Sequence, residues 1–183
     1  MYSHGADCAI TRAAACTINR CDQDNEMPKM PTDADVTSWH RYFAMDCNNG
    51  AWQLTEKDRT PAEDMQMLDA AHAASFHWSQ IGTELHRMRA KMLLARVHTL
   101  VGNGVVAVAL ATEVRAYLSA HDAPAWEMAL AHAIYAHAVH QAGDTEGHRA
   151  AYEDALRALS AVTSEEDRTL VRQTLERVPK PSP

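Results

Sequence analysis

Apolar residues recur at three- and four-residue steps along most of the chain, which is the period of an α-helix with one buried face. The pattern begins near Thr37 and continues to about residue 177. The β-branched stretch from Val105 to Val108 is flanked by glycine and followed by alanines, which favours a helix over a strand. The sequence therefore predicts an all-α fold with about seven helices, the first beginning near Thr37 and the others over residues 61–79, 84–100, 104–119, 124–141, 146–160 and 164–177.

Two of these helices begin with recognisable capping residues. Thr60, Pro61 and Glu63 place a hydroxyl at the N-cap, proline at the first position and glutamate at the third, a combination that satisfies free amide groups. Ser164 precedes three acidic residues and predicts the start of the last helix. By contrast, residues 48–50 read Asn-Asn-Gly and predict a kink or break in the first helix, because these residues weaken a helix by roughly 0.7–1 kcal/mol each.

The four central helices form two similar pairs. One pair turns at Gly102-Asn103 and the other at Gly143-Asp144, so the two turns lie 41 residues apart. A repeat of this length is typical of stacked supersecondary units. We therefore expect two antiparallel helical hairpins, with Ala95 and Ala136 at positions where paired helices cross closely.

These hairpins, over residues 84–160, resemble the tetratricopeptide-repeat superfamily. The small residues Ala95 and Ala136, the two glycine turns, and Tyr152, Ala155 and Leu156 match its pattern, whereas His148 stands where the family has a small residue. The resemblance implies a short right-handed array of antiparallel hairpins that binds protein or peptide in a groove lined by the first helix of each hairpin. The segments around 59–64 and 71–78 look like blocks of uncharacterised bacterial helical proteins, a likeness that implies no activity.

The chain is expected to form a single domain over residues 37–178. Residues 1–36 lack a sustained apolar period and include Pro28 and Pro31, which predicts a mobile tail, or alternatively the product of an artificial upstream start. Residues 179–183 form a short C-terminal tail. No apolar run is long enough to span a bilayer and the first residues lack a secretory signal, so we expect a soluble, cytoplasmic protein.

The charge and cysteine content of the chain argue against several classes of partner and site. The formal net charge is −7, and only residues 83–120 contain more basic than acidic residues. An acidic chain without a broad basic surface is a poor candidate for nucleic acid or an anionic membrane. The cysteines do not follow the spacing of a zinc site or a disulfide framework, so we interpret them as free thiols: Cys8, Cys16, Cys21 and Cys47.

Four side chains are candidates for the binding groove. Arg89 and Arg96 are seven residues apart and therefore share one helix face, where guanidinium groups suit a carboxylate or an acidic peptide. The family resemblance places His137 and His140 on the corresponding face of the second hairpin. The expected partner is a protein or peptide, and the two arginines favour an acidic one. The alternative interpretation is a solvated helix face without a ligand.

A second hypothesis is a small helical metalloenzyme. The chain contains 11 histidines, and ligands spaced by three or four residues can converge in a helical bundle. Asp69 with His72, and His137 with His140, have this spacing and form the candidate metal set. No nucleophile, phosphate-binding or metalloprotease motif accompanies them, so catalysis and a cofactor are not expected. The aromatic residues are predicted to fill the core: Trp39, Trp52, Phe76, Trp78 and Trp126.

Overall fold

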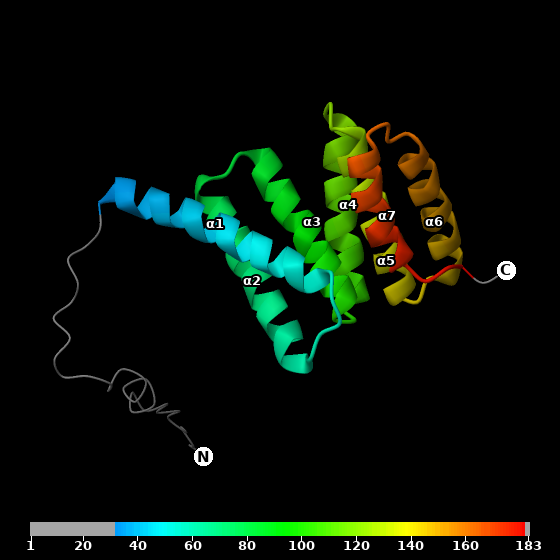
Figure 1. Cartoon of the computed structure of the whole chain (residues 1–183), viewed down its shortest axis with the longest axis horizontal. Helices are drawn as coiled ribbons and strands as arrows, with labels where there is room; N and C mark the ends of the chain where they lie inside the picture. Colours follow the sequence, from blue (N-terminus) through cyan, green and yellow to red (C-terminus); the bar gives the residue numbers. More distant parts are fainter. Residues whose placement is uncertain (1–31, 182–183) are drawn as a thin grey trace, which may run out of the picture. The chain divides into compact units, whose positions relative to one another are not determined.

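The computed structural model describes residues 32–181, and within this range it contains α-helices and no strand. The all-α prediction is confirmed (Figure 1). The helices are α1 Asp33–Thr55, α2 Pro61–Ile81, α3 Glu84–Leu100, α4 Gly104–Ala120, α5 Ala125–Gln141, α6 Thr145–Ser160 and α7 Glu165–Glu176.

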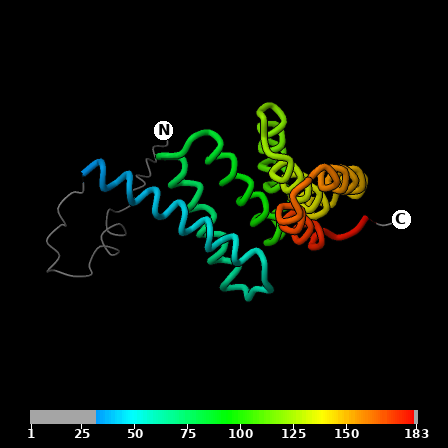
Figure 2. Tube along the Cα trace, turned by 45° about the horizontal axis from the view of Figure 1, so that its top comes forward, coloured from blue at the N-terminus to red at the C-terminus, as the bar shows by residue number. Residues whose placement is uncertain are grey.

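The helices form two layers. In the inner layer α1 contacts α3, α3 contacts α5, and α5 contacts α7, although an even-numbered helix separates each pair in the sequence. In the outer layer, α2, α4 and α6 contact only the helices that adjoin them in the chain, within the described residues. The result is an array of helical hairpins with the α1–α2 pair at one end and α6 with α7 at the other (Figure 2). The odd-numbered helices therefore share one face of the array.

Local sequence determines most helix boundaries. Thr60 and Glu63 form the predicted reciprocal capping box, and the hydroxyl of Ser164 accepts a hydrogen bond from the amide of Asp167. Gly102 and Gly143 adopt φ angles of +83° and +80°, a left-handed conformation that other residues adopt only with strain. These glycines end the first helix of each central hairpin, as the repeat predicts.

The first helix differs from its prediction in where it begins and in the absence of a break. α1 begins at Asp33 rather than Thr37, and it continues through residues 48–50 without a break. Ala44, Ala51 and Leu54 are buried along α1, which packs against α2 over much of its length. This burial outweighs a propensity cost of about 1 kcal/mol per residue. The remainder of the predicted tail, residues 1–31, lies outside the described residues.

The core is made largely of alanine and aliphatic residues. Ala95 and Ala136 are completely buried, in agreement with their predicted positions at helix crossings. His148 is also buried; its two ring nitrogens lie 3.0 Å from the carbonyl oxygen of Ala136 and 2.9 Å from that of Pro179. This histidine connects α6 to α5 and to the segment that follows α7, so Pro179 is held against the domain.

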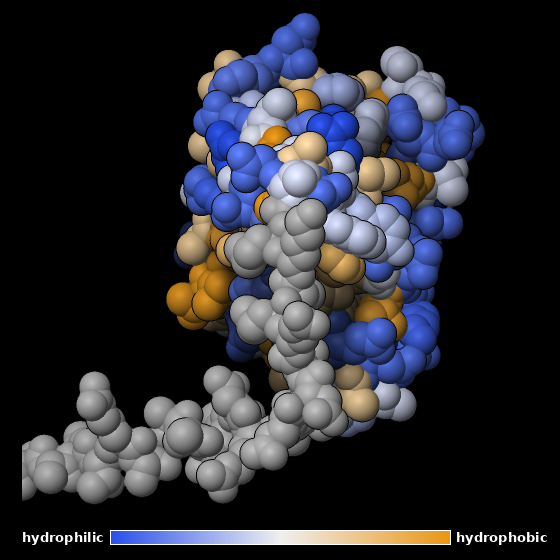
Figure 3. Space-filling model, turned by 90° about the vertical axis from the view of Figure 1, so that its left-hand side faces the viewer, coloured by the Kyte–Doolittle hydropathy of each residue, from blue (hydrophilic) through white to orange (hydrophobic). Residues whose placement is uncertain are grey.

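The prediction that the aromatic residues fill the core is confirmed only in part, since Trp52 and Trp126 pack against the buried core clusters while the other predicted rings do not. Trp39 and Phe76 are each 57% exposed. Their end of the molecule shows hydrophobic areas among hydrophilic ones (Figure 3). Trp52, Trp78 and Trp126 are half-buried. Alanines at the crossings bring helix backbones close together, and a large ring does not fit in the narrow space between them.

Substituting leucine for Ala95 or Ala136 should overpack these crossings. Each substitution should lower the free energy of unfolding by about 1–3 kcal/mol. Urea denaturation followed by circular dichroism measures the change. Ala116→Leu, on the exposed side of α4, is the matched control and should change stability by less than about 0.5 kcal/mol. Equal effects at the buried and exposed positions would show that the crossings are not tightly packed.

Gly104 tests how closely α4 approaches α5. A Cβ atom at this glycine would lie 2.4 Å from the backbone nitrogen of Ala142 and 2.4 Å from the carbonyl carbon of Gln141, at the end of α5. Because backbone atoms cannot rotate away, Gly104→Ala should lower the melting temperature and cost about 1–3 kcal/mol. Gly50→Ala is the control: a Cβ there meets nothing within 4 Å, and alanine should stabilise α1 by roughly 0.5–1 kcal/mol. A neutral Gly104→Ala would mean that the two helices lie further apart.

Candidate functional site

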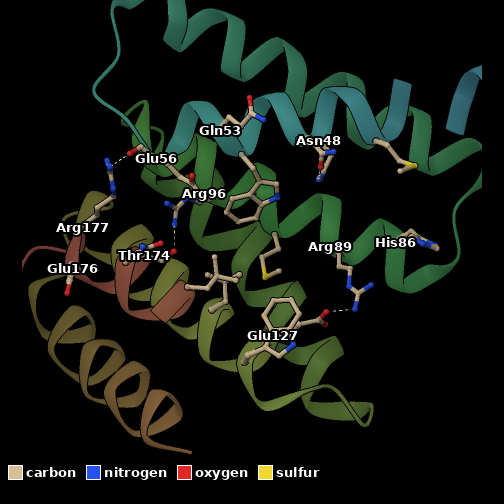
Figure 4. A pocket seen from close by; sticks show the side chains of 18 of the residues that line it. Asn48, Gln53, Glu56, His86, Arg89, Arg96, Glu127, Thr174, Glu176 and Arg177 are labelled. Carbon is tan, nitrogen blue, oxygen red and sulfur yellow. Dashed lines mark hydrogen bonds and ion pairs between the residues drawn. The ribbon is translucent and has the colours of Figure 1, made fainter. Parts of the chain in front are cut away.

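A large pocket opens on the inner layer of the array. Its volume is about 1270 Å³, and all four odd-numbered helices contribute to its lining (Figure 4). α1 supplies polar side chains and a tryptophan, α3 supplies two arginines, and α5 supplies a tryptophan and a carboxylate. α7 supplies polar side chains, and Arg177 follows directly after it. The principal lining residues are Asn48, Trp52, Gln53, Glu56, Arg89, Met92, Arg96, Trp126, Glu127, Gln173, Thr174 and Arg177.

One end of the pocket is organised around Arg96. This residue is only 6% exposed, and its Nη1 atom donates a 2.7 Å hydrogen bond to the hydroxyl of Thr174 on α7. Its guanidinium carbon lies 5.3 Å from the centre of the Trp52 ring. At this distance the ring face attracts the positive charge above it. The Nε atom is buried without a partner. Arg96 is therefore held in a fixed position with part of its hydrogen-bonding capacity unused.

Arg177 adds a second positive charge at the same end. Its side chain is directed at Glu56 and donates to the backbone carbonyl of that residue (Figure 4). Neither Arg96 nor Arg177 forms an ion pair with a carboxylate of the described residues. Burial, followed by repulsion from Arg177, lowers the pKa of Arg96 to about 10. Arg96 thus remains charged near neutral pH, and the attraction of Glu56, which also lines the pocket, offsets only part of the effect of its burial.

The other end contains the ion pair between Arg89 and Glu127. The Arg89 Nη2 atom donates to Oε1 of Glu127, and the two side chains point toward each other (Figure 4). Glu127 is completely buried, whereas the Arg89 side chain is 44% exposed. The second carboxylate oxygen, Oε2, is buried and has no hydrogen-bond partner. At the edge of this region the ring of His86 stacks on Trp78, with centroids 4.5 Å apart.

The four predicted groove residues occupy different positions. Arg89 and Arg96 both line the pocket, but Arg89 is already paired with Glu127. His137 borders a small second cavity that also contacts Arg96, and His140 is exposed beside His148, outside both cavities. The lining also includes carboxylates among its arginines. The four residues therefore do not line a single pocket: two line the large pocket, His137 borders the small cavity, and His140 lies outside both.

The candidate metal ligands do not converge. Among residues 32–181, no group of three or more histidine, cysteine, aspartate or glutamate side chains could hold a metal ion. Asp69 and His72 are exposed on α2, where the His72 ring faces His98 instead, with centroids 5.4 Å apart. Asp69 and His72 lie on α2, whereas His137 and His140 lie on α5. The two pairs therefore do not form a common metal site.

Sequence reasoning missed three important residues of the pocket. In the sequence, Glu127 looks like an ordinary acidic residue in the first turn of a helix, where its negative charge interacts favourably with the helix dipole. Thr174 lies on α7 and Arg177 is the C-cap residue that follows it, in a region for which the sequence predicts only a terminal helix. A regular alternation of inner and outer helices would have placed α7 on the same face as α3 and α5. That alternation was the available signal.

Comparison of the chain with protein-family profiles, curated proteins and solved structures finds no match. None of the helices within the described range combines the length and apolar character needed to cross a bilayer. The function is therefore inferred from the geometry of the pocket.

His137 should make folding stability depend on pH. Burial, with a smaller contribution from the positive charge of Arg96, lowers the pKa of His137 from 6.5 to about 4. The unfolded chain takes up this proton as the pH falls below about 6.5, but the folded chain does so only near pH 4, so stability decreases over that interval. Between about pH 7.5 and about pH 5 the loss attributable to His137 should be roughly 1–2 kcal/mol.

Urea denaturation of wild type and His137→Gln at both pH values isolates this contribution, because the other titrating groups are common to the two proteins. The pH-dependent loss should be smaller in His137→Gln, while His121→Gln, at an exposed position after α4, should behave like wild type. An identical pH dependence in wild type and His137→Gln would contradict the lowered pKa.

Proposed function

We propose that this protein is a binding module that holds a peptide segment of a protein partner in the inner-layer pocket. The observation that carries the proposal is the convergence of four helices, distant in sequence, on one large cavity with charged, polar and aromatic side chains. Its volume of about 1270 Å³ exceeds the roughly 300–1000 Å³ that is usual for small-molecule sites. A segment of polypeptide is a better match in size.

The lining chemistry also suits a peptide. Asn48, Asn49, Gln53 and Gln173 offer carboxamide groups that both donate and accept hydrogen bonds, as peptide groups require. Trp52 and Trp126 provide half-buried aromatic surface, which is typical of binding anchors. The resemblance to tetratricopeptide repeats supports the same role, since that family binds peptides on the face formed by the first helix of each hairpin.

The peptide should carry an acidic group at the Arg96 end. Two guanidiniums share this region without an ion-pairing carboxylate, and a buried cation is costly unless it is paired. A ligand carboxylate would pair with Arg177 and approach the fixed guanidinium of Arg96, where planar donors favour carboxylate geometry. The metalloenzyme hypothesis is not carried forward, because no described observation favours it.

Phage display of random peptides of about twelve residues tests the proposal directly. Selected peptides should contain an acidic residue and bind with an affinity that falls as salt rises. Arg177→Glu reverses an exposed charge in the pocket and should weaken a labelled selected peptide by at least about tenfold in fluorescence anisotropy, which corresponds to ~1.4 kcal/mol.

Arg172→Glu is the matched control, because Arg172 is exposed on α7 but outside the pocket lining. It should change the affinity by less than about twofold. Equal losses in the two variants, or selection that yields no binding peptide, would count against a peptide site in this pocket.

A further inference from the structure

We infer that the pocket recognises a second, cationic group of its ligand through Glu127, so that the preferred peptide carries an acidic and a basic side chain about three residues apart. This inference rests on the proposed peptide-binding function and specifies its ligand. The observations behind it come from the Arg89–Glu127 end of the pocket. The acidic group of the proposed peptide binds at the other end, near Arg96.

Glu127 is an incompletely satisfied buried carboxylate. It is 0% exposed, and of its two oxygens only Oε1 has a partner in the structure. A buried polar atom without a hydrogen bond costs about 1–3 kcal/mol, and more when the group is charged. An additional donor at Oε2 would therefore be favourable. Glu127 belongs to the pocket lining but is enclosed, so a ligand donor reaches it only by displacing a covering side chain, and the exposed partner Arg89 is the one that can move.

The two members of the ion pair are not equally fixed. Glu127 is fully enclosed, whereas nearly half of the Arg89 side chain is exposed. A long exposed arginine can rotate into solvent at little cost, but removing the counter-ion of a buried carboxylate is expensive unless another cation replaces it. Arg89 thus occupies a site that a ligand cation can share or take over. This reverses the expectation that Arg89 itself binds the acidic group of the ligand.

The surrounding side chains also suit a lysine or arginine. Met92 and Trp126 line the same pocket and present apolar and aromatic surface. The methylene groups of a basic side chain pack on such surfaces while its charged end reaches a carboxylate. A cation close to an aromatic face gains a further favourable interaction. A small metal ion would gain nothing from this lining.

The distance between the two charged regions sets the spacing within the ligand. Arg89 and Arg96 mark the two ends and lie seven residues apart on α3. At 1.5 Å per helical residue, the separation along the axis is about 10 Å. A peptide in the polyproline II conformation advances about 3.1 Å per residue with three residues per turn, so side chains at positions i and i+3 lie on one face about 9 Å apart. The inference therefore predicts an acidic and a basic side chain at positions i and i+3 of the peptide.

Parallel phage selections on wild type, Glu127→Gln and Arg177→Glu test this pattern. Wild type should select peptides with both charges at the i, i+3 spacing. Glu127→Gln, which keeps the shape of the side chain, should lose the preference for the basic residue and keep that for the acidic one. Arg177→Glu should lose the acidic preference. In anisotropy titrations, replacing the peptide lysine by methionine should weaken binding to wild type by about tenfold or more and to Glu127→Gln by less than about twofold.

Arg89→Met supplies an independent comparison. Removing the competing arginine should tighten binding of the lysine-containing peptide, because Glu127 then lacks its own counter-ion, and it should increase the preference for lysine over methionine. Weaker binding of that peptide would assign Arg89 to the acidic group of the ligand and overturn the inference. The inference would also be overturned if wild type selected acidic peptides with no preference for a basic residue. That result would leave the proposed function intact. Loss of all dependence on Arg177 would instead refute the proposed function itself.

Discussion

Close contact between helix backbones is the constraint on which the rest of this structure depends. The crossings are formed by residues with almost no side chain: Gly104 lies against the backbone at the end of α5, and Ala95 and Ala136 are fully buried. Such contacts allow a regular alternation of inner and outer helices. They also leave no room for large rings at the crossings themselves, so Trp52 and Trp126 pack at the edge of the core, where they line the pocket.

The pocket follows from this alternation. Because every second helix faces the same side, side chains from α1, α3, α5 and α7 meet even though Asn48 and Thr174 are 126 residues apart in the sequence. No single helix contains a recognisable site. The direct hydrogen bond from Arg96 to Thr174 shows how the last helix completes a pocket whose other walls belong to the hairpins before it.

Buried charge distinguishes this pocket from an ordinary polar surface. Arg96 and Glu127 are both buried, at opposite ends, and each retains a buried polar atom without a partner. Desolvation makes such groups costly to the folded protein. The same desolvation strengthens their interaction with a ligand of complementary charge, since electrostatic attraction increases as the local dielectric constant decreases. A site with a cation at one end and a carboxylate at the other selects for a ligand that carries both charges.

Local sequence determined the helices and their ends. The capping residues at Thr60 and Ser164 and the glycine turns at residues 102 and 143 act over a few neighbouring positions, so their outcome can be derived from the sequence. The continuity of α1 through Asn48, Asn49 and Gly50 could not, because packing against α2 outweighs the local propensity. Arg89 and Arg96 could be placed on one face of a helix by their spacing alone.

Only the tertiary structure decided what those arginines contact. The pairing of Arg89 with Glu127, the burial of Arg96 between Trp52 and Thr174, and the separation of His140 from the pocket all depend on how helices far apart in the chain are rotated and stacked. Helical periodicity specifies which residues share a face, but it contains no information about which face of another helix lies opposite. For this protein the sequence therefore determined the helices and their repeat, and the packing of α1, α3, α5 and α7 decided the site.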